Sequence, residues 1–362
     1  MLLAPSNIVY VDNDMFAAQG SLSSMARSGA RILCVALSLL SAIVPGVASA
    51  NGKIGTILLA EAGDPPRRNE SPANGAVAVV YPDLGEPYRS IFARIIEGIE
   101  DGARSAVRSY PIGANAAETA ELGSQLKRNG TKVVIALGRQ GLKAMSAIDR
   151  DIPVVVGAVL AVPETDNRSV TSISLTPDPN LLFARLKGLV PSVRRVTVVY
   201  NPQQNDWLIR IAREAARAQG LELVALEARD LASAARLYEN AFAVSDSKRD
   251  AIWLPQDSTT VDETTILPLA LKEAWNRNVA VFSSSFLHVK KGALFALYPN
   301  NVELGRTLAA AALGVLANDP RRRGIFPLRD VQMAVNIRTA NHIGLSIGYQ
   351  QQRSFDAIFP EP

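Results

Sequence analysis

The amino-acid sequence predicts an α/β protein built from two consecutive lobes, each with a parallel β-sheet between layers of helices. From residue 76 onward, short runs rich in β-branched residues alternate with amphipathic helical patterns. Such alternation is typical of parallel sheets with both faces covered. The alternation pauses at 161–169, a candidate linker rich in proline and polar residues, and then starts again. About 310 residues follow position 50, enough for one large or two ordinary domains.

The first unit has three expected strands and three expected helices. The strands are the apolar runs 76–81, 131–138 and 152–160. The helical patterns are 86–107, 116–130 and 139–149. The first of these carries Ile91, Ile95 and Ile99 on one side, as expected of a helix that packs on a sheet. The second ends at Gly130 after two basic residues, which is a typical helix stop.

The second unit repeats this pattern, so we expect both lobes to be Rossmann-like. Its expected strands are 169–175, 195–201, 221–228, 250–257 and 279–285. Its expected helices are 180–191, 205–220, 230–242 and 259–278, with Asp230 as an N-cap. The remainder is less regular. It comprises a strand at 292–299, an Ala-rich helix at 301–318, a loop at 319–330, a strand at 331–337 and a short helix at 338–344.

Residues 25–50 have the order of a secretory signal peptide. Two arginines precede the apolar run 32–44, and a Pro-Gly pair and a small-x-small triplet ending at Ala50 follow it. The run is too short for a helix that crosses a hydrocarbon core, which needs about 20 residues. An uncleaved membrane anchor is the alternative. We interpret residues 1–24, which precede the good initiator Met25, as an over-long start. Cleavage after Ala50 would release a periplasmic chain.

The only cysteine, Cys34, lies inside this apolar run rather than after it, so a lipid anchor is not expected. The chain after residue 50 has no cysteine, and it therefore has no disulfide, thiolate metal site or cysteine nucleophile. This composition suits a bacterial periplasm. The net charge is +4 and the basic residues are scattered, whereas nucleic-acid binding needs a basic face.

Motifs for enzymes and cofactors are weak. His288 and His342 have no partners at the spacing of metal ligands, and we expect His288 to be a surface residue. The sequence around Ser346, GLSIG, matches a nucleophile elbow, but no histidine follows it. GRQG at 138–141 lacks the full spacing of a dinucleotide loop. We therefore predict no catalytic residues, no metal and no cofactor.

Polar residues instead collect just after the expected strands. In open α/β sheets, ligands bind at the carboxyl edge of the strands. The candidate ligand-binding residues are Tyr81, Pro82, Gly138, Arg139, Gln140, Ala158, Asn201, Asn205, Asp257, Ser258, Ser284 and Ser285. Arg139 would suit a carboxylate and Asp257 an ammonium group. Each also has a local alternative, because Asp257 and the serines could cap helices and Asn201 precedes Pro202 in a possible turn.

The chain resembles the periplasmic substrate-binding proteins of ABC transporters, of the uncharacterised or aromatic-amino-acid type. The stretches that carry the resemblance are DIPVVVGAVL, RVTVVYNP, AIWLPQDSTT, VAVFSSSFLHVKKGALFALYPNNVELGRTLAAAALGVL and MAVNIRTANHIGLSI. The resemblance covers about residues 76–347 and is most specific in the last 70. This sequence departs from the family pattern at GAVLAVPETDNRSV, where an Asp-Pro pair and a Gly-rich loop are usual, and at the bulky Arg139 and Gln140.

The resemblance implies a type I periplasmic-binding architecture, with a hinge of several crossings and the ligand between the lobes. We expect the first lobe at 76–160 plus 290–325 and the second at 161–289 plus 326–347. Residues 51–75 would be an N-terminal segment and 348–362 a tail. The helix near 303–317 would return to the first lobe.

The resemblance also implies a monomer that hands an amino acid or a similar small ligand to an inner-membrane permease. Two other functions stay open at this point. A sensory or partner protein on the same fold would report its ligand to a membrane receptor. A hydrolase would use the same cleft, although the absent cysteine, the two histidines and the context of Ser346 argue against it.

Overall fold

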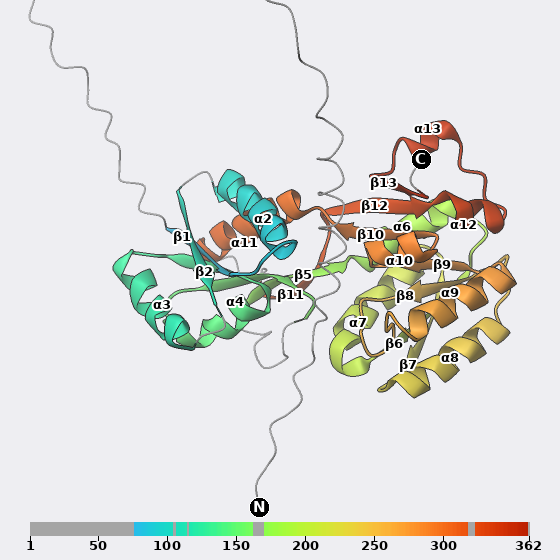
Figure 1. Cartoon of the computed structure of the whole chain (residues 1–362), viewed down its shortest axis with the longest axis horizontal. Coiled ribbons are helices and arrows are strands. Elements are labelled where there is room, and N and C mark those ends of the chain that lie inside the picture. The colour runs from blue at the N-terminus through green and yellow to red at the C-terminus, as the bar shows by residue number, and fades with distance from the viewer. Residues whose placement is uncertain (1–75, 104–105, 114–115, 162–169, 318–322, 361–362) are drawn as a thin grey trace, which may run out of the picture.

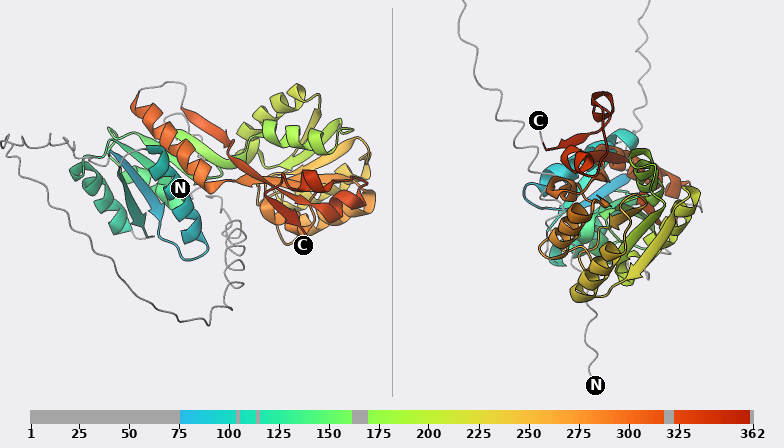
Figure 2. Two further views of the ribbon diagram at one scale, coloured as in Figure 1. Left: turned by 90° about the horizontal axis from the view of Figure 1, so that it is seen from above. Right: turned by 90° about the vertical axis from the view of Figure 1, so that its right-hand side faces the viewer.

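The computed structural model describes residues 76–360 apart from 104–105, 114–115, 162–169 and 318–322. The expected signal peptide, the N-terminal segment and most of the expected linker lie outside the described residues. The described chain forms two lobes that lie end to end (Figures 1 and 2), and each is built on its own sheet. We call the lobe with the N-terminal strand the first lobe.

The first lobe contains a six-stranded sheet in the order β11-β5-β4-β3-β1-β2. All of its pairings are parallel. Its strands, in chain order, are β1 (Val77–Pro82), β2 (Val107–Ile112), β3 (Val133–Leu137), β4 (Val154–Val159), β5 (Thr171–Pro177) and β11 (Gly324–Leu328).

Helices cover both faces of this sheet because successive side chains of a strand point to opposite faces. Val77 and Val79 of β1 join the core under α2 (Tyr88–Ala103) and α11 (Asn301–Leu316). Ala78 and Val80 join the core under α3 (Ala116–Arg128), which also borders α4 (Gly138–Ala144) and the 3-10 turn η1 (Met145–Ala147). The Ala-rich helix α11 therefore returns to the first lobe, as expected.

The helices α2 and α11 touch along glycines. A Cβ on Gly305 would lie 2.1 Å from the carbonyl oxygen of Ile95, and one on Gly98 would lie 1.9 Å from that of Val302. No real side chain fits at such distances, so the two backbones approach each other only because both positions are glycine. This contact anchors a helix from late in the chain to the N-terminal lobe.

The second lobe contains a seven-stranded sheet in the order β13-β12-β10-β9-β8-β6-β7. Only the pairing of β10 with β12 is antiparallel. Its strands are β6 (Arg195–Tyr200), β7 (Glu222–Glu227), β8 (Asp250–Leu254), β9 (Ala280–Ser283), β10 (Phe295–Pro299), β12 (Val331–Asn336) and β13 (Ala357–Phe359).

Two helical layers enclose this sheet. On one face, α6 (Pro179–Leu189) and α7 (Pro202–Ala218) cover an aromatic core in which the rings of Trp253, Phe282 and Phe183 contact one another. On the other face lie α8 (Leu231–Ala243) and α9 (Ile266–Arg277). The shorter helices α10 (Phe286–Lys291), α12 (Ile337–His342) and α13 (Tyr349–Gln352) complete the lobe.

Three short crossings connect the lobes among the described residues. They lead from β5 to α6, from β10 to α11 and from β11 to β12. The crossings are bonded to one another, because the Asp178 N–H donates to the Leu328 carbonyl at 2.7 Å and the Asn300 N–H donates to the Asp330 carbonyl at 2.9 Å. Arg329 also lies 3.4 Å from the buried carboxylate of Asp178. The expected hinge of several crossings is therefore present.

The crossings fix which edges of the two sheets face each other. The chain leaves the first lobe at the carboxyl ends of β5 and β11, and these strands are parallel to β4, β3 and β1 within one sheet. It leaves the second lobe at the carboxyl end of β10, which is parallel to β9, β8 and β6. The carboxyl edge of each sheet is therefore directed toward the other lobe.

The structure differs from the expected lobe boundaries at two whole strands and at the end of β11, whose residues after 325 are expected in the second lobe but pair in the first sheet. β5, expected in the second lobe, hydrogen-bonds within the first sheet, and β10, expected in the first lobe, lies within the second. The sequence shows a crossing only as a turn signal, and both crossings come after these strands, at Pro177 and Pro299.

The strands β2, β11 and β13 are absent from the expected elements. The expectation of a loop throughout 319–330 is wrong because this range contains β11, and the expected tail at 348–362 contains α13 and β13, which pairs with β12 in the second sheet. β2 and β11 are edge strands of their sheet, and each contains a proline. Proline is tolerated at a sheet edge, where one backbone N–H is not needed for pairing. Edge strands such as these therefore lack the unbroken run of β-branched residues that identifies a central strand in a sequence.

Candidate functional site

At the edge of the first lobe, the candidates follow β1 and β3. Pro82 ends β1, and Gly138 begins α4 directly after β3 with a φ of 68°. Only glycine adopts this conformation without strain. A Cβ on Gly138 would also lie 3.2 Å from the ring of Phe92 and 3.5 Å from Pro82. The tight turn places the half-buried Arg139 and Gln140 at the start of the helix.

The end of β4 supplies the third part of this edge. Ala158 has a φ of 56°, a conformation that a residue other than glycine rarely adopts. The pairing of β4 with β5 shifts register between Val156 and Val159, so the strand is irregular at this point. Leu308 of α11 packs against Gly157, where a Cβ would be only 2.6 Å from its methyl groups. The irregular end of β4 is thus held from behind by a helix.

At the edge of the second lobe, the carboxylate of Asp257 organises the loop after β8. One oxygen accepts the Asn201 backbone N–H at 2.7 Å and the Asn205 side-chain amide at 2.9 Å. The other accepts the backbone N–H groups of Thr259 and Thr260, at 3.0 and 3.2 Å. These four bonds use the acceptor sites of a carboxylate. Asp257 therefore joins the loop to the start of α7.

Burial raises the pKa of Asp257, although the hydrogen bonds from Asn201, Asn205 and the two threonines act to lower it. Since only 4% of the residue is exposed and its acceptor sites are occupied by the protein, an ammonium group has no ready access to it. The structure favours a local role over ligand contact, but the helix cap expected as that role is wrong, because Asp257 bonds the turn at Thr259 and Thr260 and α9 begins only at Ile266. Asn201 likewise caps α7, because its side chain accepts the N–H of Gln203.

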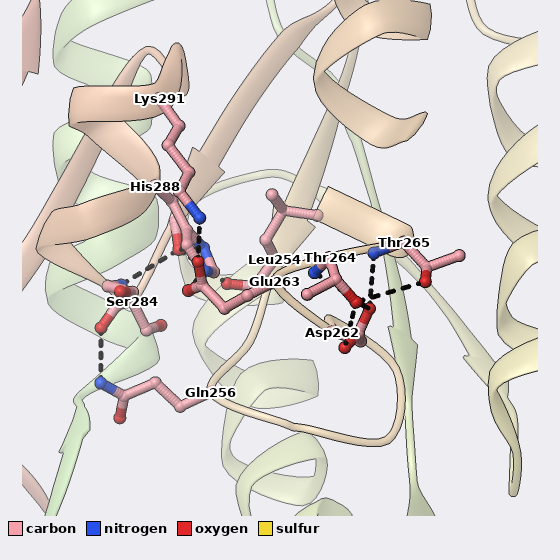
Figure 3. Close-up of polar contacts among 11 residues, drawn as sticks. Leu254, Gln256, Asp262, Glu263, Thr264, Thr265, Ser284, His288 and Lys291 are labelled. Carbon is pink, nitrogen blue, oxygen red and sulfur yellow. Dashed lines mark hydrogen bonds and ion pairs between the residues drawn. The ribbon is translucent and has the colours of Figure 1, made fainter. Parts of the chain in front are cut away.

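Next to this loop, the β9–α10 connection is tied to β8. The hydroxyl of Ser284 accepts the indole N–H of Trp253 at 3.1 Å, and the Ser284 carbonyl accepts the side-chain amide of Gln256 at 2.7 Å. Figure 3 shows Gln256 reaching from the loop toward Ser284. Ser284 is fully buried. It positions the edge rather than presenting a hydroxyl to solvent.

A second contact between these segments involves His288. The prediction that His288 is a surface residue is wrong, because 4% of it is exposed. Its Nε2 lies 3.2 Å from Glu263, and its Nδ1 lies 2.7 Å from the Ser283 hydroxyl. Lys291 pairs with the other oxygen of Glu263 (Figure 3). The hydrogen bond from His288, followed by that from Lys291, lowers the pKa of Glu263 to about 2.

The order Ser283, His288 and Glu263 resembles a catalytic triad, but its geometry does not suit one. Ser283 has no exposed surface, and its oxygen also accepts the Ser285 N–H at 3.0 Å. A nucleophile must reach its substrate, so this network is a brace between the β8–α9 loop and α10. Ser346 lies in a loop with no preceding strand, which leaves its motif without the context that an elbow needs.

Several polar groups at the two edges have unmet hydrogen-bonding capacity. The side chains of Ser258, which is exposed, and of Ser285 make no hydrogen bond to other described residues. The side-chain carbonyls of Gln140 and Gln256 are buried without a partner in the described part of the chain. An unsatisfied buried acceptor costs about 1–3 kcal/mol. These groups come from both lobes. A bound molecule could reach the exposed Ser258 directly, and it could reach the two buried carbonyls once their side chains rotate.

All candidate residues lie at or within one helical turn of the carboxyl edges. Some of them make hydrogen bonds inside their own lobe, and these bonds compete with contact to a ligand. Asn201, Asn205, Asp257 and Ser284 are bonded within the second lobe. Sequence reasoning missed Gln256, Glu263 and His288 as parts of this edge. Gln256 stands beside Asp257 and could have been found, whereas no spacing in the sequence links Glu263 to a histidine 25 residues later.

Within the described residues, no group of three His, Cys, Asp or Glu side chains could hold a metal ion. The same residues contain no helix long and apolar enough to cross a membrane.

Comparisons with known proteins give one family and several structures. The model of the family described as ABC transporter substrate binding protein matches residues 94–350. A ligand-free, open structure of a substrate-binding protein with adhesive properties from Clostridium difficile matches with a TM-score of 0.56 and 15% identity, over 78% of this chain and 98% of that one. At this identity the match shows the fold alone. No match was found among curated proteins.

Two further structures match less closely. An ABC domain from Streptococcus pneumonia in complex with L-Trp matches with a TM-score of 0.49 and 18% identity, over 79% of this chain and 100% of that one. A conserved domain protein from Vibrio cholerae matches with a TM-score of 0.47 and 18% identity, over 78% and 99% of the two chains. The bound L-Trp belongs to the streptococcal structure.

Proposed function

Because the chain belongs to the ABC transporter substrate-binding protein family, we propose that it captures a small polar solute between its two lobes and delivers it to an inner-membrane permease. Members of this family bind solutes, and theirs is a non-enzymatic class of protein. The class of ligand and the residues that bind it are proposals for this chain.

The observation that carries the proposal is the direction of the two carboxyl edges. Each sheet directs this edge toward the other lobe, and each edge bears polar groups on helix starts and loops. Ligands of open α/β sheets bind at this edge. A solute between the lobes would therefore contact Gln140 and Arg139 from one side and Ser258, Ser285 and Gln256 from the other.

We propose hinge closure as the mechanism. The crossings are short and bonded to one another, so the lobes move as units about them. A ligand that touches both lobes only in the closed state shifts the population toward that state. The permease would then recognise the closed form. A periplasmic location, with removal of residues 25–50, and a monomeric state are parts of the same proposal.

For the ligand we propose an amino acid or a small carboxylate. Amide carbonyls without donors, at Gln140 and Gln256, favour a ligand with N–H or O–H groups. Arg139 at the edge of the first lobe would suit a carboxylate. Asp257 would act indirectly, because it holds the loop that carries Ser258 and leads on to Thr259. Tyr81, Pro82, Gly138 and Ala158 would shape the wall opposite.

A sensory protein on the same fold is the second candidate. It would use the same site but signal to a membrane receptor. The departure from the usual family pattern at Arg139 and Gln140, where bulky residues stand, is the feature that keeps this function open. Genes for a permease and an ATPase beside this one would support transport, and a histidine kinase gene would support sensing.

A thermal-shift screen of the purified protein against amino acids, small carboxylates and related metabolites tests the binding proposal. A ligand of the folded state stabilises it by about 2.7 kcal/mol at a hundredfold excess over Kd. We expect one chemical class to raise the midpoint, and Ser285→Ala to reduce that rise. Lys248 is exposed and lies just before the amino end of β8, opposite the carboxyl edge of that strand. Lys248→Ala should therefore leave the rise in midpoint unchanged. Absence of any shift across the screen would count against solute capture.

A further inference from the structure

A cavity lies in the second lobe, at the end remote from the first lobe. Its volume is about 660 Å³, and it is lined by residues of α9, α10, α12 and the end of β13. Since β10 ends at a crossing and β12 runs antiparallel to it, the end of β12 and the start of α12 lie at the opposite end of the sheet. Figure 1 shows α12 at the right-hand end of the molecule, away from the first lobe. This remote cavity is separate from the candidate solute site.

The lining of the remote cavity is strongly basic. It contains Lys272, Lys290, Lys291 and Arg338 but no aspartate or glutamate. Glu263 pairs with Lys291 from outside the lining. Lys272 and Lys290 are exposed and form no ion pair with any described residue. Like charges gathered in one concavity raise the local positive potential and repel one another, so the arrangement favours an anion that neutralises several charges at once.

Aromatic and apolar groups hold part of this charge in place. The guanidinium carbon of Arg338 lies 5.4 Å from the centre of the Trp275 ring. The ring of His342 stacks on Trp275 at 3.5 Å, and its Nε2 lies 2.9 Å from the Trp275 carbonyl. Asn336 and Thr339 of the lining bond to the backbone at the end of α10, at Val289 and Gly292. The cavity wall is therefore a built structure rather than a set of independent surface lysines.

We propose that the remote cavity binds a phosphate-bearing small anion. Phosphate offers several acceptor oxygens and more than one negative charge, which matches a guanidinium together with several ammonium groups. Since Lys291 is already paired with Glu263, three cations of the lining remain, and a single carboxylate would leave most of them unpaired. The volume is within the range of about 300–1,000 Å³ for small-molecule sites, so a nucleotide-sized group fits. The phosphate could belong to a free molecule or to a lipid headgroup.

Titration calorimetry with inorganic pyrophosphate and with ATP, at about 150 mM salt to screen weak surface attraction, tests the proposal on the full protein. We expect a Kd of about 1 mM or tighter and at least a tenfold weakening in Lys290→Glu and in Arg338→Ala. Lys248→Glu is the matched control, because it changes the net charge of the same lobe equally at an exposed position outside the cavity. We expect it to bind within about twofold of the unmodified protein.

Two comparisons separate the sources and the alternatives. Sedimentation with phosphatidylglycerol vesicles that is lost in Lys290→Glu but kept in Lys248→Glu would identify a lipid headgroup as the source of the phosphate. Citrate that binds as tightly as pyrophosphate would overturn the phosphate class. Absence of binding to both soluble phosphates and vesicles, or equal weakening in Lys248→Glu, would overturn the site. Ser285→Ala should leave this binding unchanged, so its outcome is independent of the solute site.

Discussion

At the scale of single residues, the candidate site depends on two buried or half-buried carboxylates that the protein itself satisfies. Asp257 accepts four hydrogen bonds, and Glu263 is bonded to His288 and Lys291. The sequence marks Asp257 as a candidate for contact with a ligand, with a helix cap as the local alternative. A carboxylate beside a strand end has the same sequence signature whether its partners are ligand atoms or backbone N–H groups, so only the structure separates these roles.

Replacement of Asp257 by asparagine tests this role. The amide NH₂ would face N–H donors on one side, so two hydrogen bonds are lost and donors are left unpaired. We expect the free energy of unfolding to fall by about 1–3 kcal/mol, measured by urea denaturation. Ser258→Ala, at the exposed neighbour without hydrogen bonds, should change it by less than about 0.5 kcal/mol. A stable Asp257→Asn variant that loses only ligand binding would instead assign Asp257 to the ligand.

The network around Glu263 predicts a pH dependence of stability. The folded state lowers the pKa of Glu263 from 4.5 to about 2, so its contribution is fully present above pH 4.5 and is lost as the pH falls toward 2. The total is at most on the order of 3 kcal/mol. Unfolding of the unmodified protein and of Glu263→Gln should therefore differ by a constant amount above about pH 5 and converge below it.

The exposed Glu239, which makes no ion pair with described residues, provides the control as Glu239→Gln. A stability difference for Glu263→Gln that stays constant down to pH 3 would contradict the network.

At the scale of elements, the sequence predicts the central strands and the amphipathic helices but not the edges. Asp230 caps α8 as expected, with its side chain accepting the Ser233 N–H. The helix expected from residue 259 begins at Ile266, because Asp257 and Asp262 bind the N–H groups of the preceding threonines and form turns. Side chains that accept hydrogen bonds from backbone N–H groups delay the start of a helix. The spacing of apolar residues gives no information about such bonds.

The contact of α2 with α11 yields a prediction at this scale. Gly305→Ala would place a Cβ 2.1 Å from a carbonyl oxygen, and the helices would have to separate, so we expect a loss of about 1–3 kcal/mol. Gly188→Ala lies in α6 with no atom within 4 Å of the added Cβ. It should stabilise by up to about 1 kcal/mol. Equal effects of the two variants in urea denaturation would contradict a close helix contact.

At the scale of the whole molecule, the two-lobed α/β fold and the position of the candidate residues at the carboxyl edges could be predicted from the sequence. Strand ends are visible as the point where an apolar run meets polar residues. The sheet to which β5 and β10 belong could not be predicted, because it depends on where the chain crosses between the lobes, and the crossings come only after these strands, at Pro177 and Pro299. The basic remote cavity could not be predicted either, since its cations come from three helices that are distant in sequence.

The central claim is that a solute draws the two lobes together. The chain after residue 50 has no cysteine, so spin labels can be attached at Glu121→Cys on α3 and Glu214→Cys on α7, both exposed. The measurement is the distance between these labels, by pulsed electron paramagnetic resonance, with and without the compound that raises the thermal midpoint. We predict a shorter and narrower distance distribution when that compound is bound. A distribution that does not change at saturating compound would contradict binding by closure.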